Sequence, residues 1–319
     1  MQRYLLSRAI YSIPTIIGIT LLIFIAMRVI PGDPLAMISV EGQGAHRLSD
    51  EELQAARRSL GLDRPYAVQY LAWMWDVVRG NMGTSFWRGE PIIDVIARRG
   101  PISAQIAVMA ISLSWLLGVP IGLLCAIKRN TKSDYIIRAL TTVLMAIPSF
   151  WIGLVVVLVG VLWFSWRPPL SIVYFWDDPA RNLQITVGPA LALGLGLAAV
   201  TARMTRSSVL EVLHDDFVRT ARAKGLREQM VIWRHVFRNA LLPVITLSGL
   251  ALGGLLGGSV AVERAFSVPG LGLALVQALG ERDWTMIQNL VLIYGLIFTL
   301  INLLVDLSYA VLDPRIRYQ

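Results

Sequence analysis

The sequence is poor in charged residues and contains one cysteine. Of its 319 residues, 16% are Asp, Glu, Lys or Arg and 55% are hydrophobic, with a mean hydropathy of +0.62. Soluble proteins carry about 25% charged residues, so a water-soluble globular surface is excluded for a chain of this length. Cys125 stands alone, which excludes an intrachain disulfide and leaves no thiolate metal site.

Charge is missing altogether from six long runs. Each run reaches the roughly 20 residues that a helix needs to cross a hydrocarbon core of about 30 Å. Lipid offers the backbone no hydrogen-bond partners, so these runs are expected to cross as helices. We therefore expect an all-α, polytopic integral membrane protein with six transmembrane helices. The runs are Ala9–Met27, Gly100–Ile127, Ala139–Trp166, Asn182–Ala202, Asn239–Val262 and Trp284–Val305.

The sequence also lacks the motifs of several enzyme classes. It contains no H-E-x-x-H and no G-x-S-x-G, and the three histidines, His46, His214 and His235, do not fall at a metal-ligand spacing. A G-x-x-x-x-G-K-[ST] phosphate loop is absent, which excludes ATP hydrolysis by that route. These absences argue against an enzyme, including an intramembrane one.

The first apolar run resembles a signal peptide because Arg3 and Arg8 precede it. It is longer than a signal-peptide core, and Arg28–Pro34 after it offers no small-residue cleavage site. We expect it to remain as the first transmembrane helix.

The net charge of +8 is unevenly distributed along the chain. If both termini are cytoplasmic, the predicted cytoplasmic segments carry 16 Lys or Arg and the two short outside connections carry 4. The long segment Arg28–Arg99 carries the other 9, but it exceeds the loop length to which the positive-inside rule applies. The excess of positive charge therefore indicates orientation, and nucleic acid is not an expected partner.

The long outside segment is predicted to contain two helices. Ser49–Glu52 has the form of a capping box for a helix that ends near Leu60. A second helix is expected from Pro65 to Gly80, with Tyr and Trp side chains of the kind found at membrane–water boundaries. This subdomain is expected on or near the membrane surface, either as a docking surface for a substrate-delivery protein or as a cap on the other helices.

The largest predicted cytoplasmic loop contains a short amphipathic helix. Asp215 and Asp216 suit its N-terminus through the helix dipole, and Gly225 suits its C-terminal stop. Phe217 offers an apolar anchor and the small Ala221 allows close approach, as in a helix that inserts into a groove of a partner. The residues expected to make this contact are Asp216, Phe217, Arg219, Thr220, Ala221, Arg222, Ala223, Lys224 and Gly225.

This helix and the following Trp233–Pro243 resemble the ATPase-coupling loop of binding-protein-dependent ABC transporter permeases. Arg219-Thr220-Ala221 stands where the wider family has Glu-Ala-Ala, and that departure is usual in the B-type subunits of dipeptide, oligopeptide and nickel importers. The resemblance covers nearly the whole chain. The other matching segments, in the expected order, are Arg3–Leu5, Ile30–Pro34, Phe266–Gly272 and Leu312–Arg317.

The resemblance implies a type I ABC importer permease in a bacterial inner membrane, with both termini cytoplasmic. The implied partners are membrane lipid, a C-type permease subunit, two ATPase subunits that bind ATP and Mg, and an extracytoplasmic solute-binding protein. This chain would hold no cofactor itself. A small peptide is the favoured solute, with nickel chelates, glutathione and oligosaccharides as open alternatives.

We expect the chain to have three parts: residues 1–30 with the first transmembrane helix, an extracytoplasmic subdomain at 31–102, and a five-helix permease core at 103–319 that includes the coupling loop 203–240. The transport pathway is expected near the fifth helix, where Gly253 and Gly257 form a G-x-x-x-G packing motif. No residue is assigned to the solute.

The alternative function is an ion-coupled secondary carrier. Such carriers need ionisable groups at mid-membrane depth, and the six apolar runs contain none. Asn302 and Asp306 in the last helix come nearest.

Overall fold

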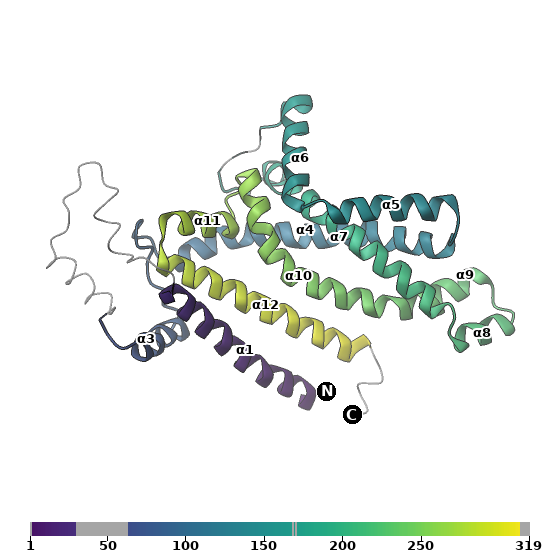
Figure 1. The fold of residues 1–319 in the computed structure, drawn as a ribbon, viewed down its shortest axis with the longest axis horizontal. Coiled ribbons are helices and arrows are strands. Elements are labelled where there is room, and N and C mark those ends of the chain that lie inside the picture. Colours follow the sequence, from purple (N-terminus) through teal and green to yellow (C-terminus); the bar gives the residue numbers. More distant parts are fainter. Residues whose placement is uncertain (1, 30–62, 168, 170, 313–319) are drawn as a thin grey trace. The chain divides into compact units, whose positions relative to one another are not determined.

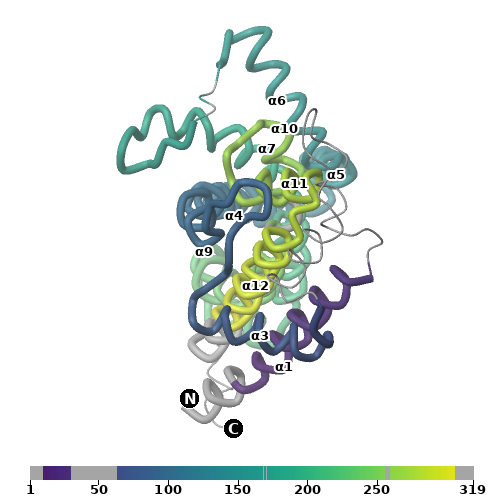
Figure 2. The backbone as a smooth tube through the Cα atoms, turned by 90° about the vertical axis from the view of Figure 1, so that its left-hand side faces the viewer, coloured from purple at the N-terminus to yellow at the C-terminus, as the bar shows by residue number. Residues whose placement is uncertain are grey.

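The computed structural model describes residues 2–29, 63–167, 169 and 171–312 of the chain. Its regular elements are helices, apart from one isolated bridge between Thr84 and Pro91, so the all-α prediction is confirmed. Figures 1 and 2 show the path of the backbone. The elements are α1 (Gln2–Val29), α3 (Tyr66–Val78), α4 (Ile92–Ile127), α5 (Lys132–Ala146), α6 (Ser149–Phe164), α7 (Pro179–Val212), α8 (Asp216–Ala223), α9 (Glu228–Met230), the π-helix η2 (Val231–Phe237), α10 (Arg238–Phe266), α11 (Leu271–Glu281) and α12 (Trp284–Leu312).

Five stretches of helix in the described residues are long and apolar enough to cross a membrane, and they fall in α1, α4, α7, α9–α10 and α12. They coincide with five of the six predicted runs. The remaining run, Ala139–Trp166, is broken into α5 and α6 by a bend of 97°. Pro148 lies at the break as the N-cap of α6, because a proline disfavours helical backbone in the residue before it. Pro120, by contrast, lies inside the uninterrupted α4.

A second broken pair follows the fifth span. The end of α10, Ser259–Phe266, and α11 are bent by 86°. The connecting turn contains Pro269 and Gly270. The polytopic membrane fold is therefore confirmed, with two bent helix pairs in addition to the five candidate spans.

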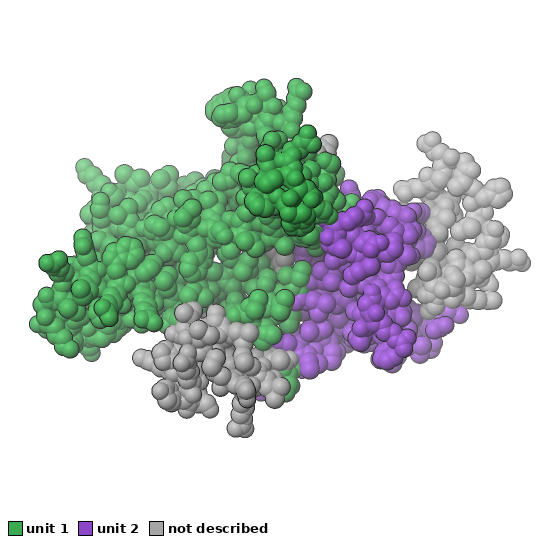
Figure 3. All heavy atoms as spheres, turned by 180° about the vertical axis from the view of Figure 1, so that it is seen from behind, with its two compact units in different colours: residues 1–10, 99–273, 297–319 green, residues 11–98, 274–296 purple. Residues whose placement is uncertain are grey.

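The chain forms two compact units, shown in Figure 3. Unit 1 contains Met1–Ile10, Arg99–Leu273 and Ile297–Gln319, and unit 2 contains Tyr11–Arg98 and Ala274–Leu296.

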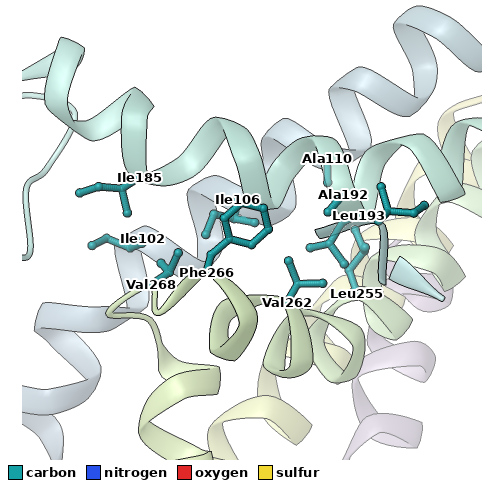
Figure 4. Packing of buried hydrophobic residues seen from close by; sticks show 11 residues of the cluster. Ile102, Ile106, Ala110, Ile185, Ala192, Leu193, Leu255, Val262, Phe266 and Val268 are labelled. Carbon is teal, nitrogen blue, oxygen red and sulfur yellow. The ribbon is translucent and has the colours of Figure 1, made fainter. Parts of the chain in front are cut away.

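Unit 1 has α7 at its centre, in contact with α5, α6 and α10. Its apolar core is drawn in Figure 4 and joins α4, α7 and the end of α10, with Ile106, Ala192 and Phe266 among its buried members. The ring of Phe266 lies against Gly188, where an added Cβ would stand 2.5 Å from ring atom Cε1. Glycine at position 188 therefore makes room for the central aromatic ring of this core.

Two pairs of glycines bring helices of unit 1 into close contact. Gly118 and Gly122 of α4 face backbone carbonyl groups of α7, and a Cβ at Gly118 would lie 2.6 Å from the oxygen of Ala198. Gly249 and Gly253 of α10 face side chains of α12. Small residues four apart allow this approach of helix backbones. Gly253 therefore packs closely against a neighbouring helix as predicted, and Gly249 is the second glycine of its pair. The packing around Gly257 lies outside the described part of the structure.

Unit 2 contains α3 beside the C-terminal part of α1, and both views of the backbone show it there. The predicted helix from Pro65 to Gly80 is confirmed, because Pro65 is the N-cap of α3 and Gly80 has a φ of +80° just after its end. The predicted helix from Ser49 to Leu60 lies outside the described residues.

An acidic side chain holds the connection after α3 to the start of α12. Asp283 accepts hydrogen bonds from Ser85 Oγ at 2.6 Å and from the backbone N–H of Phe86 at 2.9 Å. Its other oxygen accepts from the N–H of Met286 at 3.0 Å. The carboxylate thus caps α12 and fixes the preceding loop of unit 2 to it.

Candidate functional site

The predicted amphipathic helix is present as α8, and its ends are those that the sequence indicates. Asp215 is the N-cap, and the helix stops at Gly225, which has a φ of +74°. The N–H of Gly225 donates to the carbonyl of Arg222 at 2.9 Å, and the N–H of Leu226 donates to the carbonyl of Ala221 at 3.4 Å. These two bonds form a Schellman motif, for which glycine is preferred at the left-handed position.

One face of α8 packs on the chain's own helices. Val218 is fully buried and Ala221 is buried beside it. Burial of this face joins α8 to η2 and to the long helices α4, α7 and α10 in one apolar cluster. Ala221, predicted to admit a partner, instead lets α8 approach these helices closely. The buried members of this cluster, here named the α8 seat, are Leu123, Ala126, Val209, Val218, Ala221, Val231, Val236 and Ala240.

The opposite face of α8 is exposed and carries the rest of the predicted contact residues. Phe217 is 41% exposed, although it is a large apolar side chain. Arg219 lies 3.5 Å from Asp216 one turn earlier, but both side chains are well exposed, so this ion pair adds little stability. The structure thus leaves these residues open for contact: Asp216, Phe217, Arg219, Thr220, Arg222, Ala223, Lys224 and Gly225.

An ion pair joins α8 to α9. Both Nη2 and Nε of Arg222 donate to the carboxylate of Glu228, at 2.7 and 3.2 Å. The hydrogen bond from Arg222 to Glu228 raises the pKa of the guanidinium above its ordinary value. Glu228 was not among the predicted contact residues, although a glutamate six positions after an arginine, across a glycine stop, could have indicated the pair.

A π-helical segment, η2, leads from α9 into α10. Its buried positions, Val231 and Val236, are five residues apart, as the wider turn of a π-helix requires. The outward side bears Trp233, which is 60% exposed, and Met230 just before the segment is also exposed. The expected contact residues did not include these two apolar side chains, although Trp233 begins the segment Trp233–Pro243 that resembles the coupling loop.

The turn between α4 and α5 is fixed to α7 by a buried ion pair. Asp134 is fully buried and accepts from Arg206 Nε at 2.9 Å and from Nη2 at 3.0 Å. It also accepts from the backbone N–H of Asn130 at 3.1 Å. Since the end of α4, just before this turn, also contributes to the α8 seat, this pair supports the same region.

A second buried carboxylate lies at the bend between α10 and α11. Glu263 is fully buried and accepts from Ser103 Oγ and from the N–H of Gly272, both at 2.8 Å. Gly270 has no room for a Cβ beside this carboxylate. Glu263 falls just outside the predicted charge-free run, and α10 extends past it to Phe266, so the sequence prediction missed a buried acid there.

Comparison with known proteins identifies the family of the chain. The model of the family described as binding-protein-dependent transport system inner membrane component matches residues 118–318. The chain belongs to this family. The model for the N-terminal part of such membrane components matches residues 1–107.

Relatives of this permease match over its full length. It is 38% identical to a protein of Brucella abortus named as a candidate permease of a peptide transport system, with 100% of each chain covered. It is 36% identical to the oligopeptide transport system permease protein AppB of Bacillus subtilis and 37% identical to the glutathione transport system permease protein GsiC of Pectobacterium atrosepticum, again over 100% of each chain.

The comparisons confirm the predicted family, the multi-pass location in the inner membrane and the assignment as a transporter component. The permease is therefore a subunit of an ABC importer, and its family consists of transport proteins and not of enzymes. The alternative of an ion-coupled carrier is not supported, because the family model and the full-length relatives are those of ABC importer permeases.

Proposed function

We propose that this permease passes small peptides or similar solutes from an extracytoplasmic binding protein into the cytoplasm, driven by partner ATPases that attach at Asp216–Gly225. The observation that carries the proposal is that α8 is buried on one face and exposed on the other. One face is fixed in the α8 seat, and the other exposes Phe217 and charged side chains to a partner.

The α8 seat supplies a route by which motion of α8 reaches the membrane helices. Val218 contacts a cluster that includes Leu123 of α4, Val209 of α7 and Ala240 of α10. Close-packed side chains transmit a displacement because they have no free volume to absorb it. Movement of α8 by a closing ATPase pair would therefore carry the ends of three helices with it, as in rigid-body switching between two states.

The orientation in the proposal follows from charge. With α8 in the cytoplasm, the cytoplasmic segments carry 16 of the 29 Lys and Arg residues and the short outside connections carry 4. ATP and Mg would bind to the two ATPase subunits, since this sequence contains no phosphate loop. A C-type permease subunit would supply the second half of the translocation pathway.

A peptide is the proposed solute class because relatives at 36 to 38% identity are named for peptide, oligopeptide or glutathione transport. Glutathione is itself a small peptide, so the solutes in these names belong to one chemical class. Nickel chelates and oligosaccharides are outcomes that a binding screen with the cognate binding protein would identify.

The test compares Phe217 of α8 with His214, an exposed residue just before α8, in the assembled importer. Phe217→Ala removes an exposed anchor, so it should lower peptide uptake and peptide-stimulated ATP hydrolysis at least tenfold while the permease stays folded. His214→Ala, just before α8, is the matched control for an exposed substitution. Normal uptake and normal stimulated hydrolysis in Phe217→Ala, and also in Arg219→Glu, would contradict the coupling role.

A further inference from the structure

The exposed face of α3 is apolar, which is the reverse of an ordinary surface helix. Four large or branched apolar residues recur at positions i, i+3, i+7 and i+10, a spacing that places them on one helix face. Leu71 is 66% exposed and Val78 is 74% exposed. We name this face the α3 stripe; it consists of Val68, Leu71, Trp75 and Val78.

The opposite face of α3 contacts the C-terminal half of α1 through polar groups. Tyr70 Oη and Thr20 Oγ1 share a hydrogen bond of 2.8 Å, and Thr20 is fully buried. Further along α1, Arg28 Nη2 donates to Gln69 Oε1 at 3.0 Å. The ring of Phe24 lies between these two contacts, 5.4 Å from the ring of Tyr70.

The same face of α3 also contacts the start of α12. Trp73 Nε1 donates to Asn289 Oδ1 at 3.3 Å. The guanidinium that holds Gln69 also donates through Nη1 to Gln288 Oε1 at 3.1 Å. Both α12 residues lie inside the candidate span Trp284–Val305.

These contacts set the depth of α3 in the membrane. The candidate span of α1 is Ile10–Val29, 20 residues or about 30 Å of helix, and Thr20 stands at its middle. The contacts from Thr20 to Arg28 thus occupy roughly 12 Å of the second half of that span. A helix packed sideways on this stretch lies at the depth of one leaflet and not above the bilayer.

We propose that α3 lies within the leaflet that surrounds the C-terminal half of α1, with the α3 stripe in contact with lipid acyl chains. The helix α1 likewise exposes apolar side chains at this depth, namely Leu22, Ile25 and Val29. Helices that lie in a bilayer interface bury an apolar face in this way while their polar groups stay on the other side.

The end of α3 has the composition of a membrane boundary. The guanidinium of Arg79 lies 4.4 Å from the ring centre of Trp75. Trp at the interface and Arg that extends toward water are typical of such positions. Lipid therefore accounts for the α3 stripe without a protein partner, in contrast to the predicted docking surface for a substrate-delivery protein.

Site-directed spin labelling of the full-length permease, assembled with its partner subunits in phosphatidylcholine–phosphatidylglycerol nanodiscs, tests this placement. Cys125, the single native cysteine, is first replaced by alanine. Nitroxides are then attached in Leu71→Cys and Val78→Cys, with Asp76→Cys on the flank of the same helix as the matched control. Power saturation compares collisions with oxygen, which enters lipid, and with a water-soluble nickel chelate.

The proposal predicts that oxygen collides more often than the nickel chelate at positions 71 and 78, and that the ratio is lower at position 76. Adding the solute-bound binding protein should leave the two stripe positions unchanged. Greater access for the nickel chelate would place the stripe in water and overturn the proposal. Low access to both reagents, at rest or only after the binding protein is added, would show a protein cover and overturn it equally. None of these outcomes depends on the coupling role of α8.

Discussion

Two short helices of this permease, α8 and α3, expose faces of opposite polarity. In α8 the apolar Val218 is buried and charged residues such as Arg219 face outward. In α3 the polar Gln69 faces inward, while Leu71 and Val78 face outward. The inner face of each helix packs against the chain itself, so the residue types on the outer face indicate what that face contacts. The charged face of α8 suits water or a protein partner, and the apolar face of α3 suits lipid.

The largest predicted effect concerns the support behind the α8 seat. Asp134→Ala leaves Arg206 without its carboxylate, and loss of one partner of a buried ion pair costs about 3–5 kcal/mol. Thermal unfolding of the purified permease in detergent should show a large fall in Tm. Asp216→Ala removes the partner of Arg219 in an exposed pair and serves as the control with an unchanged Tm. Equal shifts for the two variants would show that the buried pair does not support the fold.

The next effect separates the two faces of α8. Val218→Ala removes two methyl groups from a fully buried site, so the free energy of unfolding should fall by about 2 kcal/mol. Phe217→Ala should lower ATPase binding and leave that free energy nearly unchanged, because its ring is partly exposed. Thermal unfolding and co-purification of the ATPase measure the two quantities. A reversed pattern would mean that α8 has its faces exchanged.

Substitution of a charged residue on the outer face of α3 tests whether that face contacts lipid or water. Leu71→Lys should be accepted with a small change of Tm, since a lysine can extend its ammonium to the headgroups. Leu71→Asp has no such reach and should lower stability by roughly 1–2 kcal/mol in lipid nanodiscs. Unfolding of both variants in nanodiscs checks the difference. If both were equally harmless, the stripe would face water.

The smallest effect is expected at the ion pair between α8 and α9. Arg222→Gln should change the free energy of unfolding by less than about 1 kcal/mol, because both side chains are substantially exposed. The pair raises the pKa of Arg222 and lowers the pKa of Glu228, so it is lost only in strong alkali or, at the other end, in acid that protonates Glu228. Arg222 should therefore add no pH dependence to Tm near neutrality. A pH-dependent Tm that disappears in Arg222→Gln would contradict this.

Much of the fold could be predicted from the sequence because membrane helices are specified by local composition. The spans, the helix after Pro65 and the stop at Gly225 all follow from residues within a few positions of each other. The bend at Pro148 is also local, although a proline alone does not state how sharply two helices diverge.

The remaining features depend on contacts between distant residues. Ala221 was expected to admit a partner, but it is buried in a cluster that includes residues of α4, far earlier in the sequence. Glu263 could not be recognised as buried, because its partner Ser103 lies 160 residues earlier. The stripe on α3 is visible as an apolar pattern, but its depth is indicated only by the contact of Tyr70, on the opposite face, with Thr20 in the middle of α1.

Photocrosslinking from both helices in the assembled importer gives the most direct test. Benzoylphenylalanine replaces Thr220 on the exposed face of α8 in one sample and Leu71 on α3 in another. We expect an adduct between position 220 and an ATPase subunit, and lipid adducts alone from position 71. An intact complex in which position 220 reaches no ATPase subunit would contradict the assignment of α8 as the attachment point of the motor.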